Sequence, residues 1–316
     1  MNQKGKKAAW YILFTLPLLF IFTTVVIIPF FTGLRYSFYD WDGMPRTPRT
    51  FVGFDNFVNL IGDDRFWSSA QRSFVFTIIA VILINVVGLA FALIVTSKLK
   101  TSNLGRTMLF MPFLIGGLIL GYIWNFILGQ TMSALGQNLD GIVGYEYNGA
   151  FVQWMVDIGF IGWLRESIFF NWIIHPRFAF VSLLVVMTWQ MAGYIMIIYI
   201  TGLQAISDEV IEAANVDGAG FWATLFRIKF PLLMPAFTVS LFLTLRDSFR
   251  VFDVNLSLTG GGPAHATEMI AMNIFNEIVR LRNFGYGQTK ALVFLLIVAT
   301  ITLIQVRITK KREVMM

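Results

Sequence analysis

Four charged side chains interrupt one apolar run, residues 232–256: Arg246, Asp247, Arg250 and Asp253. A charge left in lipid hydrocarbon costs several kcal/mol, so these groups should face the interior of a helix bundle or a water-filled cavity. On adjacent helical turns they could form ion pairs, Asp247 with Arg250 and Arg250 with Asp253. Alternatively, this helix face contacts a polar solute that crosses the membrane. The residue types leave both roles open.

Two helical stripes could line the path of such a solute. Side chains at positions i, i+3, i+4 and i+7 share one face of the charged run, and they are Thr244, Asp247, Ser248 and Val251. The second stripe, in the apolar run 178–203, consists of Met187, Gln190, Met191 and Tyr194. Asp247 and Ser248 can bond to hydroxyl groups, whereas Arg250 can pair with a carboxylate. For the second stripe, plain helix packing with Met filling gaps is the alternative.

The remaining residues exclude most catalytic chemistry. The chain has no cysteine, and its two histidines, His175 and His265, lie far apart without a ligand cluster. The run Gly260-Gly261-Gly262-Pro263 lacks the lysine of a phosphate-binding loop. We therefore expect no enzyme activity, no metal and no cofactor bound by this chain.

The composition indicates a membrane protein. Of the 316 residues, 57% are hydrophobic and 13% charged, and the mean hydropathy is +0.70. The net charge of +6 comes mostly from Lys and Arg beside apolar runs, which favours membrane topology over nucleic-acid binding.

The hydropathy pattern predicts an all-α membrane protein with six transmembrane helices in a single domain, residues 1–316. A span needs about 20 apolar residues, and the predicted spans are about 9–34, 73–97, 107–128, 178–203, 232–256 and 284–308. The first run is too long for a signal peptide, and no cleavage site follows it, so we expect it to be retained.

The basic residues predict the orientation. Eight of the nine lysines fall on the side that holds both termini, which is therefore expected to be cytoplasmic. The outer loops are then about 35–72, 129–177 and 257–283. Within the longest loop, the stretch 151–173 is rich in Trp and Phe but carries Asp157, Arg165 and Glu166. It is predicted to form one or two interfacial helices, with a seventh span as the alternative.

The cytoplasmic segment 206–231 predicts helix, sharp turn, helix. Ser207 and Asp208 are candidate caps, Asp217-Gly218 ends the first helix, and a second helix covers about 221–230. Pro231 marks the entry into the fifth span. The second helix carries apolar side chains that could dock a partner protein; alternatively, the segment packs on the chain's own spans.

This segment also carries a family resemblance. Glu212-Ala213-Ala214, Gly218, Ile228 and Pro231 have the spacing of the EAA loop and resemble ABC importer permeases, with Phe230 where Leu is usual. SFYDWDG at 37–43, FVGFDNFVNLIGDDRFW at 51–67, LTGGGPAHATEMI at 258–270 and GYGQTKA at 285–291 resemble the carbohydrate-uptake subgroup. Within it, the chain is similar to the larger membrane subunit of maltose-type systems.

The resemblance implies a type I ABC importer permease fold, in the cell membrane of a prokaryote, that imports a sugar or oligosaccharide by alternating access. The implied partners are a second permease subunit, two ATP-binding subunits that hold ATP and Mg, and an extracytoplasmic solute-binding protein. The residues implied to couple to the ATPase are Glu212, Ala213, Ala214, Asp217, Gly218, Phe226, Ile228 and Pro231. The implied sugar contacts fall on the two stripes described above, where Tyr194 suits the apolar face of a sugar ring.

Three alternatives remain at this point. An ion-gradient-driven secondary transporter would use the charges of the fifth span for coupling, although no internal repeat is evident. A membrane scaffold or sensor would transport nothing. An ABC importer for an acidic saccharide or another polar solute would use Arg246 and Arg250 against the cargo.

Overall fold

The structure, a computed structural model, describes residues 3–96, 102–137 and 170–311, with side chains from residue 13 onward. It contains two compact units. Unit 1 comprises Met1–Trp67 and Asn273–Ile297, and unit 2 comprises Ser68–Met272 and Val298–Met316. The prediction of a single domain stays a prediction.

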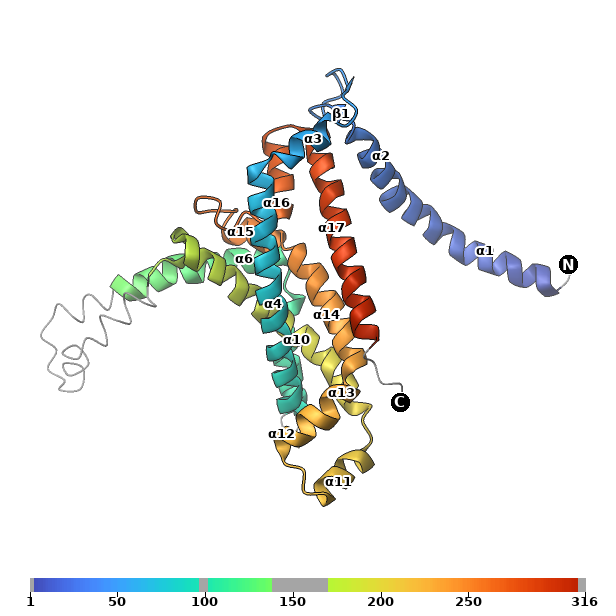
Figure 1. Ribbon diagram of the computed structural model, residues 1–316, viewed down its shortest axis with the longest axis vertical. Coiled ribbons are helices and arrows are strands. Elements are labelled where there is room, and N and C mark those ends of the chain that lie inside the picture. The colour runs from blue at the N-terminus through green and yellow to red at the C-terminus, as the bar shows by residue number, and fades with distance from the viewer. Residues whose placement is uncertain (1–2, 97–101, 138–169, 312–316) are drawn as a thin grey trace, which may run out of the picture. The chain divides into compact units, whose positions relative to one another are not determined.

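Five helices in the described part of the chain are long and apolar enough to span a membrane, and a bent pair makes a possible sixth. The five are Leu13–Tyr36, Asp64–Thr96, Gly117–Gln137, Pro176–Gln204 and Phe284–Lys310. The bent pair is Phe221–Leu232 with Met234–Phe249, at 73°. The first, second, fourth and sixth predicted spans therefore coincide with long helices, which Figure 1 shows as separate ribbons.

In unit 1, helix α1 (Gln3–Phe22) continues through a π-helical turn, η1 (Thr23–Ile27), into α2 (Ile28–Tyr36). A short antiparallel hairpin of β1 (Tyr39–Asp40) and β2 (Thr50–Phe51) follows, and then α3 (Asp55–Ile61). The end of α16 (Ile270–Phe275), from Asn273 onward, and all of η6 (Asn276–Arg280) belong to this unit. They lead to α17 (Phe284–Lys310).

A buried lysine organises unit 1. The Lys290 ammonium on α17 is only 1% exposed and lies 2.8 Å from an Asp63 carboxylate oxygen and 2.7 Å from one of Glu277. It also donates to Asn273 Oδ1 and lies over the Tyr286 ring. Burial would raise the pKa of the Asp63 carboxyl, but hydrogen bonds from Lys290, the Phe66 amide and the Tyr286 hydroxyl outweigh it and hold that pKa below its ordinary value. This cluster fixes α17 to the start of α4.

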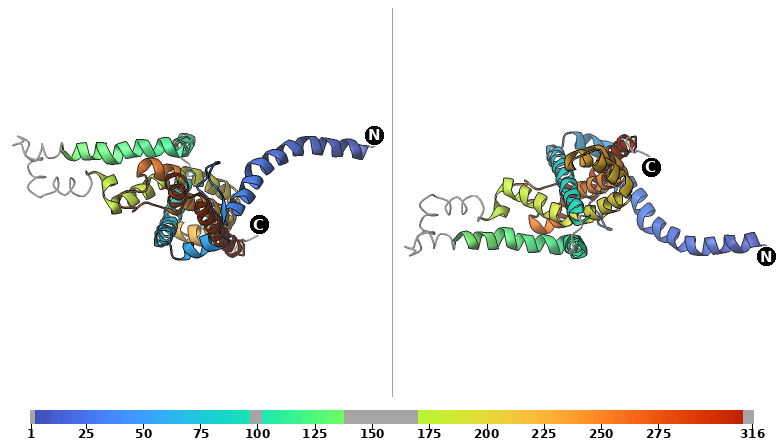
Figure 2. Two further views of the ribbon diagram at one scale, coloured as in Figure 1. Left: turned by 90° about the horizontal axis from the view of Figure 1, so that it is seen from above. Right: turned by 90° about the horizontal axis from the view of Figure 1, so that it is seen from below.

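Unit 2 contains most of α4 (Asp64–Thr96) and the helices between α4 and α16 that the structure describes. They are α5 (Ser102–Phe110), η2 (Met111–Leu114), α6 (Gly117–Asn125), η3 (Phe126–Thr131), η4 (Trp172–Ile174), α10 (Pro176–Gln204), α11 (Asp208–Val216), α12 (Phe221–Ala223), η5 (Thr224–Lys229), α13 (Phe230–Leu232), α14 (Met234–Phe249) and α15 (Asp253–Leu258). Figure 2 shows the η3 region beside η4 and the start of α10.

Small residues let these helices approach closely. A Cβ added at Gly88 of α4 would lie 2.9 Å from the Ile195 side chain of α10, and one at Gly202 would lie 2.8 Å from Ala236 of α14. Between membrane helices such close packing supplies much of the attraction, because lipid is as apolar as the helices themselves. α10 is therefore held firmly between α4 and α14.

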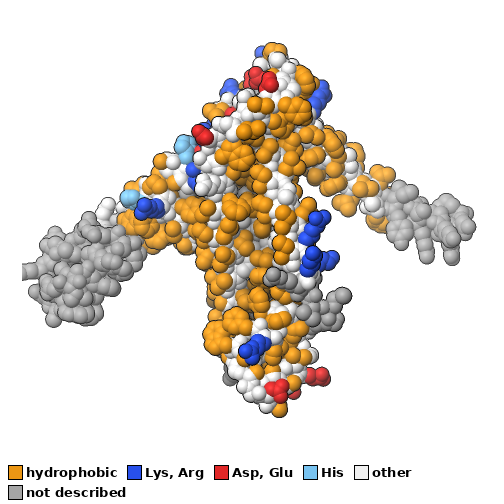
Figure 3. Space-filling view, viewed as in Figure 1, with side chains coloured by type: hydrophobic (Ala, Val, Ile, Leu, Met, Phe, Trp, Pro, Cys, Tyr) orange, Lys and Arg blue, Asp and Glu red, His pale blue; other side chains and the backbone are white. Residues whose placement is uncertain are grey.

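The exterior of unit 2 is apolar, as a lipid- or subunit-facing surface requires. Along α4, exposed side chains include Phe74, Val75, Ile78 and Ile82. Figure 3 shows mostly hydrophobic side chains along the visible face of these helices, with charged ones at the α11–α12 end and at a few other places.

The predicted third span, residues 107–128, is not one helix. α5 ends at Phe110, a 3₁₀ turn follows at Met111–Leu114, and Ile115 is extended with ψ 126° before α6 begins at Gly117. Pro112 lacks the amide hydrogen that an α-helix needs, and the Gly116-Gly117 pair favours the break that follows. The helical span instead covers Gly117–Gln137, so residues 129–137 of the predicted outer loop are helical.

The predicted fifth span, residues 232–256, is also broken. It bends at Leu233, between Pro231 and Pro235, and α14 ends at Phe249. Residues 250–252 are not helical, and a new helix, α15, begins at Asp253. Proline explains the bend, because neither proline can donate a backbone hydrogen bond. The predicted interfacial helices at 151–173 lie outside the described residues except for residues 170–173, where the 3₁₀ turn Trp172–Ile174 begins.

Candidate functional site

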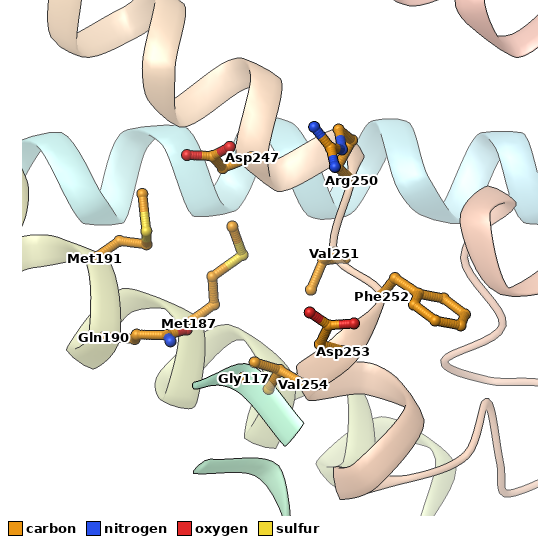
Figure 4. A pocket seen from close by; sticks show the side chains of 10 residues that line it. All are labelled: Gly117, Met187, Gln190, Met191, Asp247, Arg250, Val251, Phe252, Asp253 and Val254. Atoms are coloured by element: carbon orange, nitrogen blue, oxygen red, sulfur yellow. The ribbon is translucent and has the colours of Figure 1, made fainter. Parts of the chain in front are cut away.

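A pocket of about 250 Å³ lies in unit 2 where α6, α10, α14 and α15 meet. Its lining residues are Gly117, Met187, Gln190, Met191, Asp247, Arg250, Val251, Phe252, Asp253 and Val254. Figure 4 shows Met187, Gln190 and Met191 on one side and the 247–254 segment on the other, with the Phe252 ring turned away from the other labelled side chains. A pocket that combines thioether, amide, carboxylate and guanidinium groups suits a polar ligand with apolar faces.

The break after α14 builds this pocket. Arg250 caps α14, with φ −93° and ψ 15°, and Phe252 adopts φ −127° and ψ −59°, so the chain changes direction before α15. α6 supports the new direction, since a Cβ at Gly117 would lie 3.0 Å from Asp253 Cβ and 3.2 Å from the Val254 side chain. Ser257 also lies against Gly117, with its hydroxyl 3.4 Å from the Gly117 carbonyl oxygen. Glycine is therefore needed at position 117 by close approach.

The ion pairs of this region differ from the predicted ladder. Arg246 pairs with its neighbour Asp247 through two hydrogen bonds, Nε to Oδ1 at 2.8 Å and Nη2 to Oδ2 at 2.9 Å. Within the described part of the chain, Arg250 and Asp253 make no ion pair. The possible pairs Asp247–Arg250 and Arg250–Asp253 are not formed, because the helix stops at Phe249, so residues 250 and 253 do not follow on one helical face.

The pocket unites the two predicted stripes in part. Six of the nine predicted path residues line it: Met187, Gln190, Met191, Asp247, Arg250 and Val251. The Gln190 amide also donates to the Ile115 carbonyl at 3.1 Å, in the break of the third span.

The other three predicted path residues lie outside the pocket. Tyr194 stacks on Phe113, with ring centroids 4.4 Å apart. Thr244 is buried and bonded to Asn85, and Ser248 is buried with no partner for its hydroxyl among the described residues. Thr244, Asp247 and Ser248 all lie on α14, but Thr244 and Ser248 are buried against the chain's own residues, whereas the Asp247 side chain reaches the pocket.

Sequence reasoning missed the lining residues Gly117, Phe252 and Val254, and it placed Asp253 among the interior charges but not among the path residues. Two signals could have indicated them. The Gly116-Gly117 pair inside an apolar run marks a break or a close contact. Asp253, seven residues after Arg246, is too far along a helix to share the pairing of Arg246 and Asp247, so its charge needs another environment.

The segment 206–231 folds as helix, turn, helix, as predicted. α11 begins after Ser207, which has the extended conformation of a cap residue although its side chain makes no capping hydrogen bond. Gly218 adopts φ +76°, and the Ala219 amide bonds back to the Ala214 carbonyl at 2.9 Å. Only glycine takes such a φ without strain, which explains Gly218 at this turn.

The second helix of this segment exposes an aromatic pair. Trp222 and Phe226 are 67% and 61% exposed, and their rings stack with centroids 5.8 Å apart. On the same helix Leu225 is buried, and on α11 Ala214 is buried. The segment thus packs on its own chain with one face and presents an apolar face outward. Of the other predicted coupling residues, Glu212, Ala213 and Asp217 are exposed, and Ile228 and Pro231 are half-buried.

Comparison with known proteins places the chain in a family. Residues 102–314 match the family described as binding-protein-dependent transport system inner membrane component. The chain belongs to this family. Among the residues that the structure describes, no group of three or more His, Cys, Asp and Glu side chains could hold a metal ion.

Individual relatives of this inner membrane component cover nearly its whole length. A probable starch degradation products transport system permease protein of Thermoanaerobacterium thermosulfurigenes is 42% identical over 311 residues, 98% of this chain and 97% of the relative. A multiple sugar-binding transport system permease of Streptococcus mutans is 26% identical over 90% of each chain. A trehalose/maltose transport system permease of Thermococcus litoralis is 28% identical over 98% of this chain and 97% of its own. The resemblance to carbohydrate-uptake ABC permeases is confirmed.

A solved structure supports the fold. A chain of a bacterial ABC transporter involved in the import of the acidic polysaccharide alginate superposes with a TM-score of 0.74 at 18% identity, covering 98% of both chains. This inner membrane component therefore has the helical fold of an ABC importer permease and is a multi-pass membrane protein.

Proposed function

We propose that this chain is the permease subunit of an ATP-driven importer for an oligosaccharide. The observation that carries the proposal is the 42% identity, across nearly the whole length, to a permease described as transporting starch degradation products. The pocket supports it: Gln190, Asp247, Asp253 and Arg250 offer hydrogen-bond donors and acceptors to hydroxyl groups, and Met187 offers an apolar surface to a sugar ring.

The charges of the pocket favour a neutral cargo. Asp247 is paired with Arg246, which leaves Arg250 and Asp253 as one positive and one negative group at the wall. A neutral oligosaccharide can bond to both without adding a charge to the membrane interior.

The proposed transport cycle rests on the family and on the exposed apolar face of segment 206–231. The solute-binding protein docks on the outer loops and delivers the sugar. Two ATP-binding subunits hold ATP and Mg and act on segment 206–231, where Trp222 and Phe226 would enter a groove of one of them. A second permease subunit completes the translocation path by alternating access. This chain contributes no ATPase site; it lies in a prokaryotic plasma membrane with both termini in the cytoplasm.

An acidic saccharide is the second candidate cargo. The unpaired Arg250 guanidinium in the pocket is the observation that favours it, because a uronate carboxylate could pair with it in a bidentate manner.

Uptake in cells tests the proposal. We would delete the gene, restore it on a plasmid, and measure the uptake of labelled neutral and acidic oligosaccharides with each strain. Uptake of a neutral series that depends on the gene supports the proposed cargo, and dependence of acidic saccharides alone supports the second candidate. If no saccharide depends on the gene, the cargo class is wrong. Uptake that survives loss of the ATP-binding subunits would contradict ATP-driven transport.

A further inference from the structure

Four buried polar side chains join three helices inside unit 2. They are Asn85 of α4, Tyr199 of α10, and Ser240 and Thr244 of α14, and we name them the Asn85 cluster. None of them lines the pocket. Polar groups buried between apolar membrane helices hold those helices together, since in lipid they find few other partners.

Asn85 uses its whole hydrogen-bonding capacity in this cluster. Its Oδ1 accepts from the Tyr199 hydroxyl at 2.7 Å and from the Ser240 hydroxyl at 2.8 Å. Its Nδ2 donates to Thr244 Oγ1 at 3.1 Å and to the Val81 carbonyl oxygen at 2.8 Å. A side-chain amide has two donors and two acceptor positions, so every one is satisfied, and one residue binds both α10 and α14 to α4.

The Asn85 cluster lies on the stretches of α10 and α14 that connect the pocket to segment 206–231. Tyr199 follows Met191 of the pocket by eight residues, about 12 Å along the helix, and five residues later α10 ends at Gln204. Ser240 and Thr244 precede Asp247 of the pocket on α14. The cluster is therefore placed where motion of the segment would be transmitted to the pocket.

The two helices that wall the pocket are connected to the segment in different ways. α10 runs without a break from the pocket to Gln204. α14 meets Phe221–Leu232 at a bend of 73° around Leu233. A displacement of the segment is passed directly along α10, whereas the bend can absorb it before it reaches α14.

We propose that Asn85 is a positioning residue that fastens α14 to α10 beyond this bend. When the ATP-binding subunit displaces segment 206–231, both walls of the pocket then move as one body, and ATP hydrolysis is coupled to movement of the whole pocket. This inference rests on the proposed function, because it assumes that the segment receives the ATP-driven motion.

The test compares two substitutions on α4. Asn85→Leu removes all four hydrogen bonds at similar volume. Thr77→Val is the matched control, because Thr77 is buried on the same helix and its hydroxyl has no partner among the described residues. With the complete transporter in proteoliposomes, we would measure ATP hydrolysis and uptake of labelled maltooligosaccharide together. We expect Asn85→Leu to retain ATP hydrolysis and to lower sugar transported per ATP by about threefold to tenfold, the range for lost hydrogen bonds between membrane helices.

A second readout does not depend on the cargo. The chain has no cysteine, so Val185→Cys on α10 and Phe242→Cys on α14 give the only two label sites in this subunit. In the double-cysteine protein without further change, and in the same protein with Thr77→Val, the distribution of distances between the two spin labels should stay narrow and unchanged when ATP is added. In Asn85→Leu it should broaden or shift with ATP.

Distinct outcomes overturn the two proposals. If Asn85→Leu lowers uptake and ATP hydrolysis in parallel and leaves the label distance narrow, Asn85 has a structural role only and the inference is wrong. If Asn85→Leu fails to assemble, Thr244→Val and Tyr199→Phe each remove part of the cluster with little change of shape. An unchanged ratio of sugar transported to ATP hydrolysed in both variants then contradicts the inference. If the wild type hydrolyses ATP but moves no saccharide, the cargo proposal fails, while the label distance still decides the role of Asn85.

Discussion

At the residue scale, the cost of burying a charge determines where charged side chains can lie. Arg246 and Asp247 satisfy each other, whereas Arg250 and Asp253 are left at the pocket wall. The sequence predicted correctly that this run carries charges of functional interest, because four charges in an apolar helix are costly. It could not predict the pairing, because the partners depend on where the helix ends, and Phe249 carries no stop signal that sequence rules recognise.

Arg250→Gln tests the charge at the pocket wall. Gln keeps hydrogen-bond donors but removes the charge, so uptake of a neutral oligosaccharide should fall by no more than about tenfold, the difference between a charge-assisted and a neutral hydrogen bond. Initial rates of uptake over a range of sugar concentrations provide the measurement. A complete loss of transport with an intact complex would instead favour the acidic cargo, since Arg250 would then be the main contact.

Lys290→Met tests the buried cluster of unit 1. The substitution leaves Asp63 and Glu277 together without their cation, and breaking a buried ion pair in this way costs about 3–5 kcal/mol. The transporter should assemble poorly and unfold at a lower temperature, measured by size-exclusion chromatography after heating. Lys310→Met on the same helix is the control, because Lys310 is exposed. Equal stability of the two variants would contradict a stabilising role for the cluster.

At the element scale, long apolar helices were predicted correctly, whereas the breaks within two of the predicted spans were not. The predicted spans 178–203 and 284–308 agree with α10 and α17 to within two residues at each end. An apolar run of that length must satisfy its backbone hydrogen bonds within itself in lipid, which an α-helix does. The breaks at Pro112–Gly116 and at residues 250–252 depend on what packs beside them. Gly117 of α6 and Asp253 of α15 meet there. Local hydropathy cannot predict such a contact, because the two residues are far apart in the sequence.

The turn after α11 provides a prediction with a close control. Gly218 has φ +76°, so Gly218→Ala is strained by about 1 kcal/mol and Gly218→Pro, whose ring fixes φ near −65°, is excluded from this conformation. Gly220→Ala should be neutral, because Gly220 has φ −70° and no atom within 4 Å of an added Cβ.

We expect Gly218→Pro to abolish co-purification of the ATP-binding subunit while the helices remain folded, with Gly218→Ala intermediate. Co-purification and circular dichroism of the same samples provide the measurement. Normal binding of the subunit by Gly218→Pro would argue against this segment as its docking site.

At the scale of the whole molecule, the two membrane sides remain to be assigned. The distribution of lysines predicts that segment 206–231 is cytoplasmic and the loop 257–283 is outside. Single cysteines can test this, because the chain has none of its own.

Val216→Cys and His265→Cys place a thiol at exposed positions of the segment and the loop, with Val216 87% exposed. A membrane-impermeant maleimide applied to spheroplasts should label His265→Cys and should reach Val216→Cys only after the membrane is opened. Labelling in the reverse order would invert the topology, and the proposed direction of transport with it.

The break between α14 and α15 has an evolutionary consequence. Residues 250–252 lie between two helices rather than within one, and the Arg250 and Phe252 side chains are not buried, so these two can change without disturbing the helical contacts of Asn85 or Gly117. A transporter could therefore acquire a new cargo by a few substitutions in this short segment, while its contacts with the ATP-binding subunits stay the same. Libraries randomised at Arg250 and Phe252, with the buried Val251 kept, are the natural starting point for redirecting this importer to other sugars.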